Sequence, residues 1–405
     1  MTIATDVRAL RDVDVADVLK ADRRAATMRR TQDGIVFRYD DGYLGTGGPA
    51  IATTLPISSE PLVTAAGAVP PFFAGLLPEG RRLTAVREAL KTSLDDELSL
   101  VLAIGGDPVG DVRVVPAGER PVLPQPTVVW RDGADISFRE VLDRSGLLER
   151  RGMAGVQDKA SAAMITVPAS AGGEDAILKL TPPESPNLVD NEAWFLGLAR
   201  KAGLSVPAFR IIVDRTGERG LLIERFDRRV IDGQLIRYAV EDGAQALGIY
   251  PADKYRVTSE QVAWALIGVC QARRVAARDM MRMVLFAWLT GNGDLHAKNA
   301  SIINIGGEWR IAPVYDVHST LPYGDDTLAL TLSGRDQDLS RKAFLQFGEA
   351  IDLPQAAATR AIDEMLVATK PVLQVFQENA EAFTRPRNAD VRAQLERRRR
   401  LLIAG

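Results

Sequence analysis

The chain has 405 residues, of which 46% are hydrophobic, and this composition predicts a folded protein of two or three domains. Its formal net charge of −3 argues against an affinity of the whole protein for nucleic acid. The single cysteine, Cys270, excludes an intramolecular disulfide and a thiolate zinc cage, and it fits a reducing compartment. The N-terminus has no apolar stretch of signal-peptide length, and no window is long enough for a membrane span, so we expect a cytoplasmic protein.

The first region, up to about residue 120, combines short strand-like runs with turns. Residues 34–39 predict a strand and residues 81–91 predict a helix. The glycine-rich residues 105–111 lack the lysine and the strand-loop-helix setting of a nucleotide P-loop, so they predict a turn. Residues 116–127 contain four prolines and predict a connector to the next region.

From about residue 150 the pattern favours nucleotide binding. The glycine-bearing residues 152–159 precede a strand expected at 162–167, and such a loop brings backbone N–H groups close to phosphates. The next expected strand, 176–180, carries Lys179 among apolar neighbours, and the helix expected after it carries Glu192 as one candidate partner. This order is that of the small lobe of a kinase, where the lysine binds nucleotide phosphates. The alternative is a surface lysine and a solvated glutamate.

Two further strands, 209–214 and 221–226, lead to a charged stretch that we expect to cross into a second lobe. Backbone groups near Glu224 and Phe226 would then meet the adenine edge, although these charges also fit a solvated rim. From about residue 240 helices dominate. They are expected at 259–273, 278–289, 341–350 and 354–369. The tail has four consecutive arginines after Glu396, and we interpret it as a solvated helix end rather than a site for an acidic partner or nucleic acid.

The most informative stretch follows the apolar run 280–289, which predicts a buried helix that ends at Gly291. In the polar loop after it, Asp294 and Asn299 stand five residues apart. Protein kinases have this spacing between the aspartate that orients the attacking hydroxyl and the asparagine that holds magnesium. Downstream, strands at 301–305 and 308–312 predict a hairpin that would fold Asp316 back toward Asn299 as a second metal ligand.

An aspartate, an asparagine and a second aspartate supply the hard oxygen donors that magnesium needs beside nucleotide phosphates. The alternative is a turn-rich connection whose Asn and Asp side chains only satisfy backbone groups. The chain has two histidines, His296 and His318, and both lie in this block, so a histidine-based metal site elsewhere is excluded. His296 fits a phosphate contact and a scaffold role equally, and His318 fits a structural role.

Taken together and in this order, these stretches resemble the HipA family of bacterial serine/threonine kinases, the toxin component of HipBA-type toxin–antitoxin systems. The matching stretches are 43–44, 71–73, 77–80, 154–159, 177–179, 191–192, 224–228, 291–299 and 315–317. The resemblance implies an α+β, kinase-like two-lobed fold with a β-rich N-terminal region and a mainly helical C-terminal lobe. It implies an N-terminal HipA-type subdomain at 1–120, a small lobe at 121–240 and a helical lobe at 241–405.

The resemblance also implies ATP- and magnesium-dependent phosphoryl transfer to a protein serine or threonine. The residues that it assigns are Asp294 as the catalytic aspartate, Asn299 and Asp316 as magnesium ligands, and Gly155, Gln157, Lys159, Lys179, Glu224, Phe226, His296 and Lys298 as ATP-binding residues. The family's substrates include aminoacyl-tRNA synthetases, whose phosphorylation causes growth arrest or persistence. Its usual partner is a HipB-like helix-turn-helix antitoxin, so DNA is expected only through the antitoxin, and no membrane is involved.

The chain departs from the family at one point. Well-studied members autophosphorylate a serine a few residues before the glycine-bearing loop, where this chain has Arg150 and Arg151. Ser145 lies further upstream and Ser161 lies downstream, so self-inactivation at the usual position is not expected. Two alternatives to a protein kinase stay open: a nucleotide-binding pseudokinase that acts as a co-repressor with an antitoxin, and a kinase that acts on a small molecule.

Overall fold

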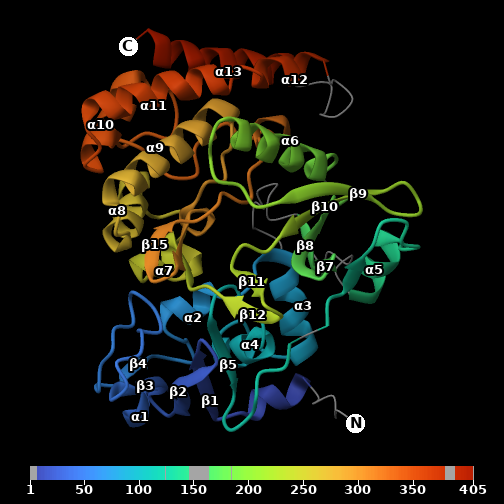
Figure 1. Ribbon diagram of the computed structural model, residues 1–405, viewed down its shortest axis with the longest axis vertical. Helices are drawn as coiled ribbons and strands as arrows, with labels where there is room; N and C mark the ends of the chain where they lie inside the picture. The colour runs from blue at the N-terminus through green and yellow to red at the C-terminus, as the bar shows by residue number, and fades with distance from the viewer. Residues whose placement is uncertain (1–6, 124, 146–163, 184, 379–387, 405) are drawn as a thin grey trace.

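The structure is a computed structural model that describes residues 7–123, 125–145, 164–183, 185–378 and 388–404. Along the longest axis it runs from the N-terminal region through a middle sheet to the C-terminal helices (Figure 1). The fold is mixed, with a sheet-rich N-terminal region and a helical C-terminal part, as the sequence predicts.

The N-terminal region is built on a five-stranded antiparallel sheet with the strand order β4-β3-β2-β1-β5. Its strands are β1 (Val15–Lys20), β2 (Arg23–Thr31), β3 (Gly34–Tyr39), β4 (Leu62–Thr64) and β5 (Val112–Pro116). The helices are η1 (Val7–Asp12), α1 (Asp41–Leu44), α2 (Pro71–Gly75), α3 (Gly80–Leu90) and α4 (Glu97–Ile104). The strand predicted at 34–39 is confirmed. The helix predicted at 81–91 is α3, which ends one residue earlier because Lys91 adopts a left-handed conformation with φ of 54°.

The middle sheet has the order β6-β7-β8-β10-β9. Its strands are β6 (Val128–Trp130), β7 (Ile165–Ala171), β8 (Glu174–Leu180), β9 (Phe209–Val213) and β10 (Arg219–Glu224), and its helices are α5 (Phe138–Ser145) and α6 (Leu188–Lys201). Leu178 and Leu180 join the apolar cluster around Phe138 on one face of β8. Because side chains alternate along a strand, Lys179 lies on the other face. The strand predicted to start at 162 is β7, and its predicted first residues lie outside the described part.

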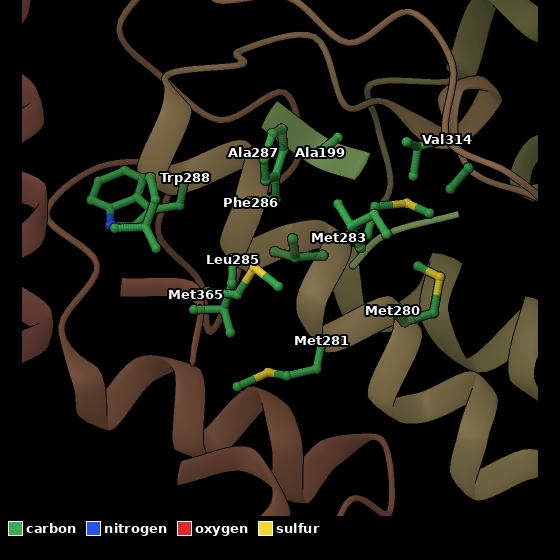
Figure 2. Packing of buried hydrophobic residues seen from close by; sticks show 14 of the residues in the cluster. Ala199, Met280, Met281, Met283, Leu285, Phe286, Ala287, Trp288, Val314 and Met365 are labelled. Carbon is green, nitrogen blue, oxygen red and sulfur yellow. The ribbon is translucent and has the colours of Figure 1, made fainter. Parts of the chain in front are cut away.

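The C-terminal part surrounds one long helix, α9 (Arg273–Thr290). Figure 2 shows how Met281, Phe286 and other side chains of this helix pack with Met365 of α11 in one cluster. The other helices are α7 (Gly243–Leu247), η3 (Pro251–Asp253), α8 (Ser259–Val269), η4 (Ala297–Asn299), η5 (Leu321–Tyr323), α10 (Arg341–Ala350), α11 (Gln355–Ala368), α12 (Val372–Glu378) and α13 (Asn388–Ile403). The strands are the β11 (Arg228–Ile231) and β12 (Gln234–Arg237) hairpin and the β13 (Val240–Asp242), β14 (Ser301–Ile305) and β15 (Glu308–Ile311) sheet.

Two helix boundaries differ from the prediction by four or five residues. The first ends at Val269 instead of 273, because Cys270 has an extended backbone, and α9 begins at Arg273 instead of 278. Nearly every residue of α9 from Met280 onward is buried, so this helix is a rigid support for the loop that follows it. None of the helices in the described ranges is long and apolar enough to cross a membrane.

The interpretation of the arginine run as a solvated helix end is wrong for two of its members. Arg398 is 5% exposed, its Nη1 donates to the carbonyl of Trp288 at 2.9 Å, and its guanidinium lies 4.2 Å from the centre of the Trp288 ring. Arg399 donates to Thr369 Oγ1 at 3.0 Å. Because α9 ends with free carbonyl groups, an inward-facing arginine satisfies one of them. Arg398 therefore attaches α13 to α9, the helix that carries the polar loop, and Arg399 attaches α13 to the end of α11.

Candidate active site

Lys179 joins two elements of the site through its ammonium group. Its Nζ donates to Glu192 Oε1 and Oε2 at 2.6 and 2.9 Å, and it also forms an ion pair with Asp316. Burial alone would lower the pKa of Lys179, but Asp316 and Glu192 outweigh it and hold the pKa above its usual value. The predicted partner Glu192 is thus confirmed, and the alternative of a surface lysine is wrong, since Lys179 is only 6% exposed.

The polar loop begins where α9 stops at Gly291. Its φ of +72° favours glycine, and a Cβ there would lie 2.3 Å from the Leu321 side chain. Asn292 Oδ1 then accepts from the backbone N–H of Asp294 at 2.8 Å, and Thr320 Oγ1 accepts from that of Gly293 at 2.9 Å. The sequence left open that Asn and Asp side chains of this loop only bind backbone groups, and Asn292 does so. These bonds fix the backbone on which the Asp294 side chain stands.

Asp294 and Asn299 contact each other within this loop. Asn299 Nδ2 donates to the Asp294 carbonyl at 2.8 Å and lies 3.5 Å from Asp294 Oδ2. Because the amide nitrogen is engaged in this way, the amide oxygen of Asn299 is the atom left to act as a ligand. Both residues are buried, at 1% and 7% exposure.

The predicted hairpin brings Asp316 back to Lys179. The pairing of Ile305 with Glu308 confirms the two-residue turn between β14 and β15. Tyr315 then anchors the chain, because its hydroxyl donates to the Lys298 carbonyl at 2.7 Å. Asp316 itself has a φ of 51°, an uncommon left-handed conformation for a residue other than glycine, and its carboxylate meets Lys179.

His296 is close enough to Asp294 and Asp316 for both charges to affect its pKa. Burial lowers its pKa to about 4, although Asp294 and Asp316 both oppose this shift through their charges. Its Nδ1 accepts from the backbone N–H of Lys298 at 3.2 Å. In this structure the ring therefore braces the loop, the second of the two roles that the sequence left open.

The Lys298 ammonium group contacts the N-terminal region. Its Nζ donates to the carbonyl of Gly75 at 2.8 Å and lies 3.6 Å from Glu79 Oε1 and 4.0 Å from Asp242 Oδ2. Gly75 ends α2, and its carbonyl together with Glu79 attracts the ammonium group. Lys298 thus links the N-terminal region to the loop and is not brought together with Lys179.

Glu224 and Phe226 lie at the crossing between the two lobes. The backbone N–H of Glu224 donates to the carbonyl of Ala208 at 2.9 Å, so this group is already used inside the middle sheet. The Phe226 ring stacks on Tyr315, with 5.8 Å between the ring centres and an interplanar angle of 25°. Phe226 therefore lies beside the segment that carries Asp316. The remaining expected phosphate-binding residues, Gly155, Gln157 and Lys159, lie outside the described residues.

Tyr255 is a site residue that sequence reasoning missed. Its hydroxyl donates to Asp294 Oδ1 at 3.0 Å from a position 39 residues earlier in the chain. The hydroxyl is held protonated, because burial and then the charge of Asp294 raise the pKa of Tyr255. No local motif marks such a contact.

A second missed feature is a largely buried group of charges beside the lobe crossing, which we call the hinge cluster: Asp107, Asp175, Arg225, Asp227, Arg228 and Arg237. Asp107 belongs to the predicted turn 105–111, and it pairs with all three arginines. Asp227 Oδ2 accepts from the backbone N–H of Gly110 at 2.9 Å. The cluster therefore fastens the N-terminal region to the crossing. The charge run at 224–229 was its only sequence signal.

Lys179 with its partners Glu192 and Asp316, together with Asp294 of the polar loop, forms a second charged group that we call the catalytic cluster. One positive charge here faces three negative ones. Within the described residues, no group of three or more His, Cys, Asp or Glu side chains is arranged to hold a metal ion alone. Magnesium is commonly held by one or two carboxylates with substrate phosphates, so an excess of negative charge with an available asparagine oxygen fits magnesium bound together with a nucleotide.

The fold and the site define a class of protein. A sheet with a lysine–glutamate pair, followed by a helical part with an Asp–Asn loop, is the arrangement of a two-lobed kinase fold. The chain matches HipA in a solved Shewanella oneidensis complex of HipA, HipB and operator DNA, with a TM-score of 0.75 and 23% identity over 96% of this chain and 97% of that one.

The particular family follows from the sequence comparisons. Residues 16–115 match the HipA N-terminal domain and residues 152–372 match the HipA-like C-terminal domain. The chain therefore belongs to the HipA family. It is 30% identical to "Putative kinase Y4mE" of Sinorhizobium fredii, over 85% of this chain and 89% of that protein. It is 28% identical to "Serine/threonine-protein kinase toxin HipA" of Shewanella oneidensis, over 76% and 75% of the two chains.

Proposed function

We propose that the protein is an ATP- and magnesium-dependent serine/threonine protein kinase of the HipA toxin type. The observation that carries this proposal is the position of Lys179, which contacts Glu192 and Asp316 at once beside the Asp294 loop. Active protein kinases need a lysine–glutamate pair and a metal-binding aspartate together.

Each residue then has one task in phosphoryl transfer. Asp294 orients the acceptor hydroxyl and receives its proton. The Asn299 amide oxygen and the Asp316 carboxylate hold magnesium, which when bound offsets the charge of the phosphates. Lys179 contributes a further positive charge to the phosphates, and Glu192 keeps it in place.

The nucleotide lies along the crossing between the lobes in this proposal. Phe226, already stacked on Tyr315, offers an apolar face to the adenine, next to the backbone around Glu224. Gly155, Gln157 and Lys159 supply the phosphate loop. His296 supports the loop under the phosphates, and Lys298 supports it from the side of the N-terminal region.

The proposals for the acceptor and for the partner protein are based on the relatives of this chain. The Shewanella relative is named a serine/threonine-protein kinase toxin, and this supports a protein hydroxyl as the acceptor, with an aminoacyl-tRNA synthetase as the candidate. The solved complex contains HipB and operator DNA, and this supports a HipB-like antitoxin as the partner, with DNA bound through it. Growth arrest or persistence is the expected consequence of such phosphorylation.

The test is transfer of label from radioactive ATP to proteins of a kinase-depleted cytosolic extract, with magnesium present. We expect a discrete labelled band with the wild type and at least about a 100-fold weaker band with Asp294→Asn, because general-base and orienting groups typically contribute that much. Asp294→Asn should still bind ATP. No label from a wild type that binds ATP would contradict the kinase proposal and favour the co-repressor or the small-molecule kinase.

A further inference from the structure

Tyr255 covers the catalytic carboxylate. It follows η3 and reaches Asp294 Oδ1 with its hydroxyl at 3.0 Å, while Asp294 is left only 1% exposed. Tyr255 itself is 39% exposed. The tyrosine ring therefore lies between this carboxylate and the surface.

The ring is held on more than one side. The His296 ring meets it edge to face, with 5.0 Å between the ring centres and an interplanar angle of 86°. Lys254 Nζ lies 5.2 Å from the centre of the Tyr255 ring and forms an ion pair with Glu79 of the N-terminal region. Both contacts hold the Tyr255 ring in one orientation, and in this orientation its hydroxyl donates to Asp294.

Tyr255 binds the oxygen of Asp294 that an acceptor hydroxyl would need. Asp294 Oδ2 faces the Asn299 amide at 3.5 Å, on the side of the expected metal ligands. Oδ1 faces the Tyr255 hydroxyl, which donates a hydrogen bond just as an acceptor hydroxyl would donate one to the catalytic aspartate of a kinase.

We propose that Tyr255 is a positioning residue that holds the place of the acceptor hydroxyl, so that transfer requires an acceptor that displaces it. This inference rests on the proposed kinase function. Without an acceptor, the tyrosine hydroxyl keeps water away from Asp294 Oδ1, and ATP is not hydrolysed wastefully. A protein acceptor must therefore insert its hydroxyl deeply enough to move the ring, which selects a hydroxyl on a protruding segment over water.

The test is ATP hydrolysis by the purified protein with magnesium and no protein acceptor. In this reaction a water oxygen bonds to the γ-phosphorus, the bond from that phosphorus to the β,γ-bridging oxygen breaks, and Asp294 receives the water proton. Tyr255→Phe keeps the ring but removes the hydroxyl, so the closed arrangement loses a hydrogen bond to a charged group. We expect kcat for hydrolysis to rise by roughly tenfold, the population shift that such a bond supports, with the KM for ATP unchanged.

A matched control is Tyr250→Phe, since the Tyr250 hydroxyl donates to the carbonyl of Val69 at 3.2 Å and does not contact Asp294. Its hydrolysis rate should equal that of the wild type. A merely supportive role of Tyr255 would make Tyr255→Phe slower, because Asp294 would be held less well. An equal or lower rate in Tyr255→Phe therefore overturns the inference.

The outcome also separates this inference from the proposed function. A wild type that labels its extract band, together with a Tyr255→Phe variant that hydrolyses no more ATP, contradicts the role of Tyr255 alone. Absence of both labelling and hydrolysis in the wild type and in Tyr255→Phe contradicts the kinase proposal, and the inference with it.

Discussion

The hinge cluster and the catalytic cluster are both largely buried groups of charges, but the balance of positive and negative charges differs between them. In the hinge cluster three arginines face three aspartates, including Asp175. The catalytic cluster contains one lysine, which pairs with Glu192 and Asp316, and the further carboxylate Asp294, so its formal net charge is −2. Buried charges without partners are costly, so a balanced cluster is complete in itself and an unbalanced one needs a further cation.

This difference in charge balance suggests that the hinge cluster serves the stability of the fold and that the catalytic cluster serves activity. The hinge cluster holds the N-terminal region against the crossing between the lobes, so loss of one of its charges should affect stability first. The catalytic cluster has unfavourable electrostatics where we propose that a metal–nucleotide complex binds, so loss of one of its negative charges should affect activity more than stability.

The largest expected effect on stability is that of Asp227→Asn in the hinge cluster. Asp227 is 3% exposed, and although burial alone would raise its pKa, Arg225 and Arg228 lower it to about 2. The change removes the carboxylate that Arg225 and Arg228 share and leaves them Asp107, which also pairs with Arg237, so we expect the free energy of unfolding to fall by about 3 kcal/mol in urea titrations. Asp253→Asn, which removes an exposed pair with Arg256, should cost less than about 1 kcal/mol and serves as the control.

An intermediate effect is expected from pH at His296. Its pKa is about 4 in the folded protein against 6.5 in the unfolded chain. Above pH 6.5 the ring is neutral in both states, and as the pH falls toward 4 the unfolded chain binds a proton that the folded protein excludes, so stability is lost. From pH 7.5 to pH 5 this amounts to about 2 kcal/mol.

The measurement for this effect compares urea unfolding of the wild type and His296→Asn at both pH values. Asparagine can accept the bond from the Lys298 N–H without titrating. The wild type should lose about 2 kcal/mol more than His296→Asn between pH 7.5 and pH 5, because the other titrating groups are common to both proteins. Equal losses in the two proteins would mean that His296 is not held neutral. The effect of Asp227→Asn should stay constant over this range, since Asp227 remains ionised.

The smallest effect on stability is expected for Asp294→Asn. The change brings the net charge of the catalytic cluster from −2 to −1, and the new amide oxygen can still accept from Tyr255. We expect the free energy of unfolding to change by less than about 1 kcal/mol, in either direction, in the same urea titrations. A loss as large as that of Asp227→Asn would remove the distinction between the two clusters.

What the sequence predicted is mostly local. The lysine strand, the glutamate helix, the end of α9 at Gly291 and the β14–β15 hairpin are confirmed, because apolar periodicity and the glycines at turns encode them within short windows. The family and the two-lobed fold are confirmed as well, because the motifs that carry the resemblance keep their order along the chain.

What the sequence did not predict depends on contacts between distant residues. In the sequence Asp107 is an ordinary turn residue, and only the fold places three arginines around it. Tyr255 and Asp294 are likewise far apart in the sequence and in contact in the fold. The contacts of Lys298 with Gly75 and Glu79 also join distant residues, and its assignment to ATP stays a prediction. The arginine run was misread because its burial depends on how α13 packs on α9.

The measurement that tests the central claim most directly is calorimetric titration of ATP into the wild type and Asp316→Asn, with and without magnesium. If magnesium completes the catalytic cluster, it should tighten ATP binding to the wild type by at least about tenfold, or about 1.4 kcal/mol, and have little effect on Asp316→Asn. ATP binding to the wild type that is equally tight without magnesium, or an undiminished magnesium effect in Asp316→Asn, would contradict the account.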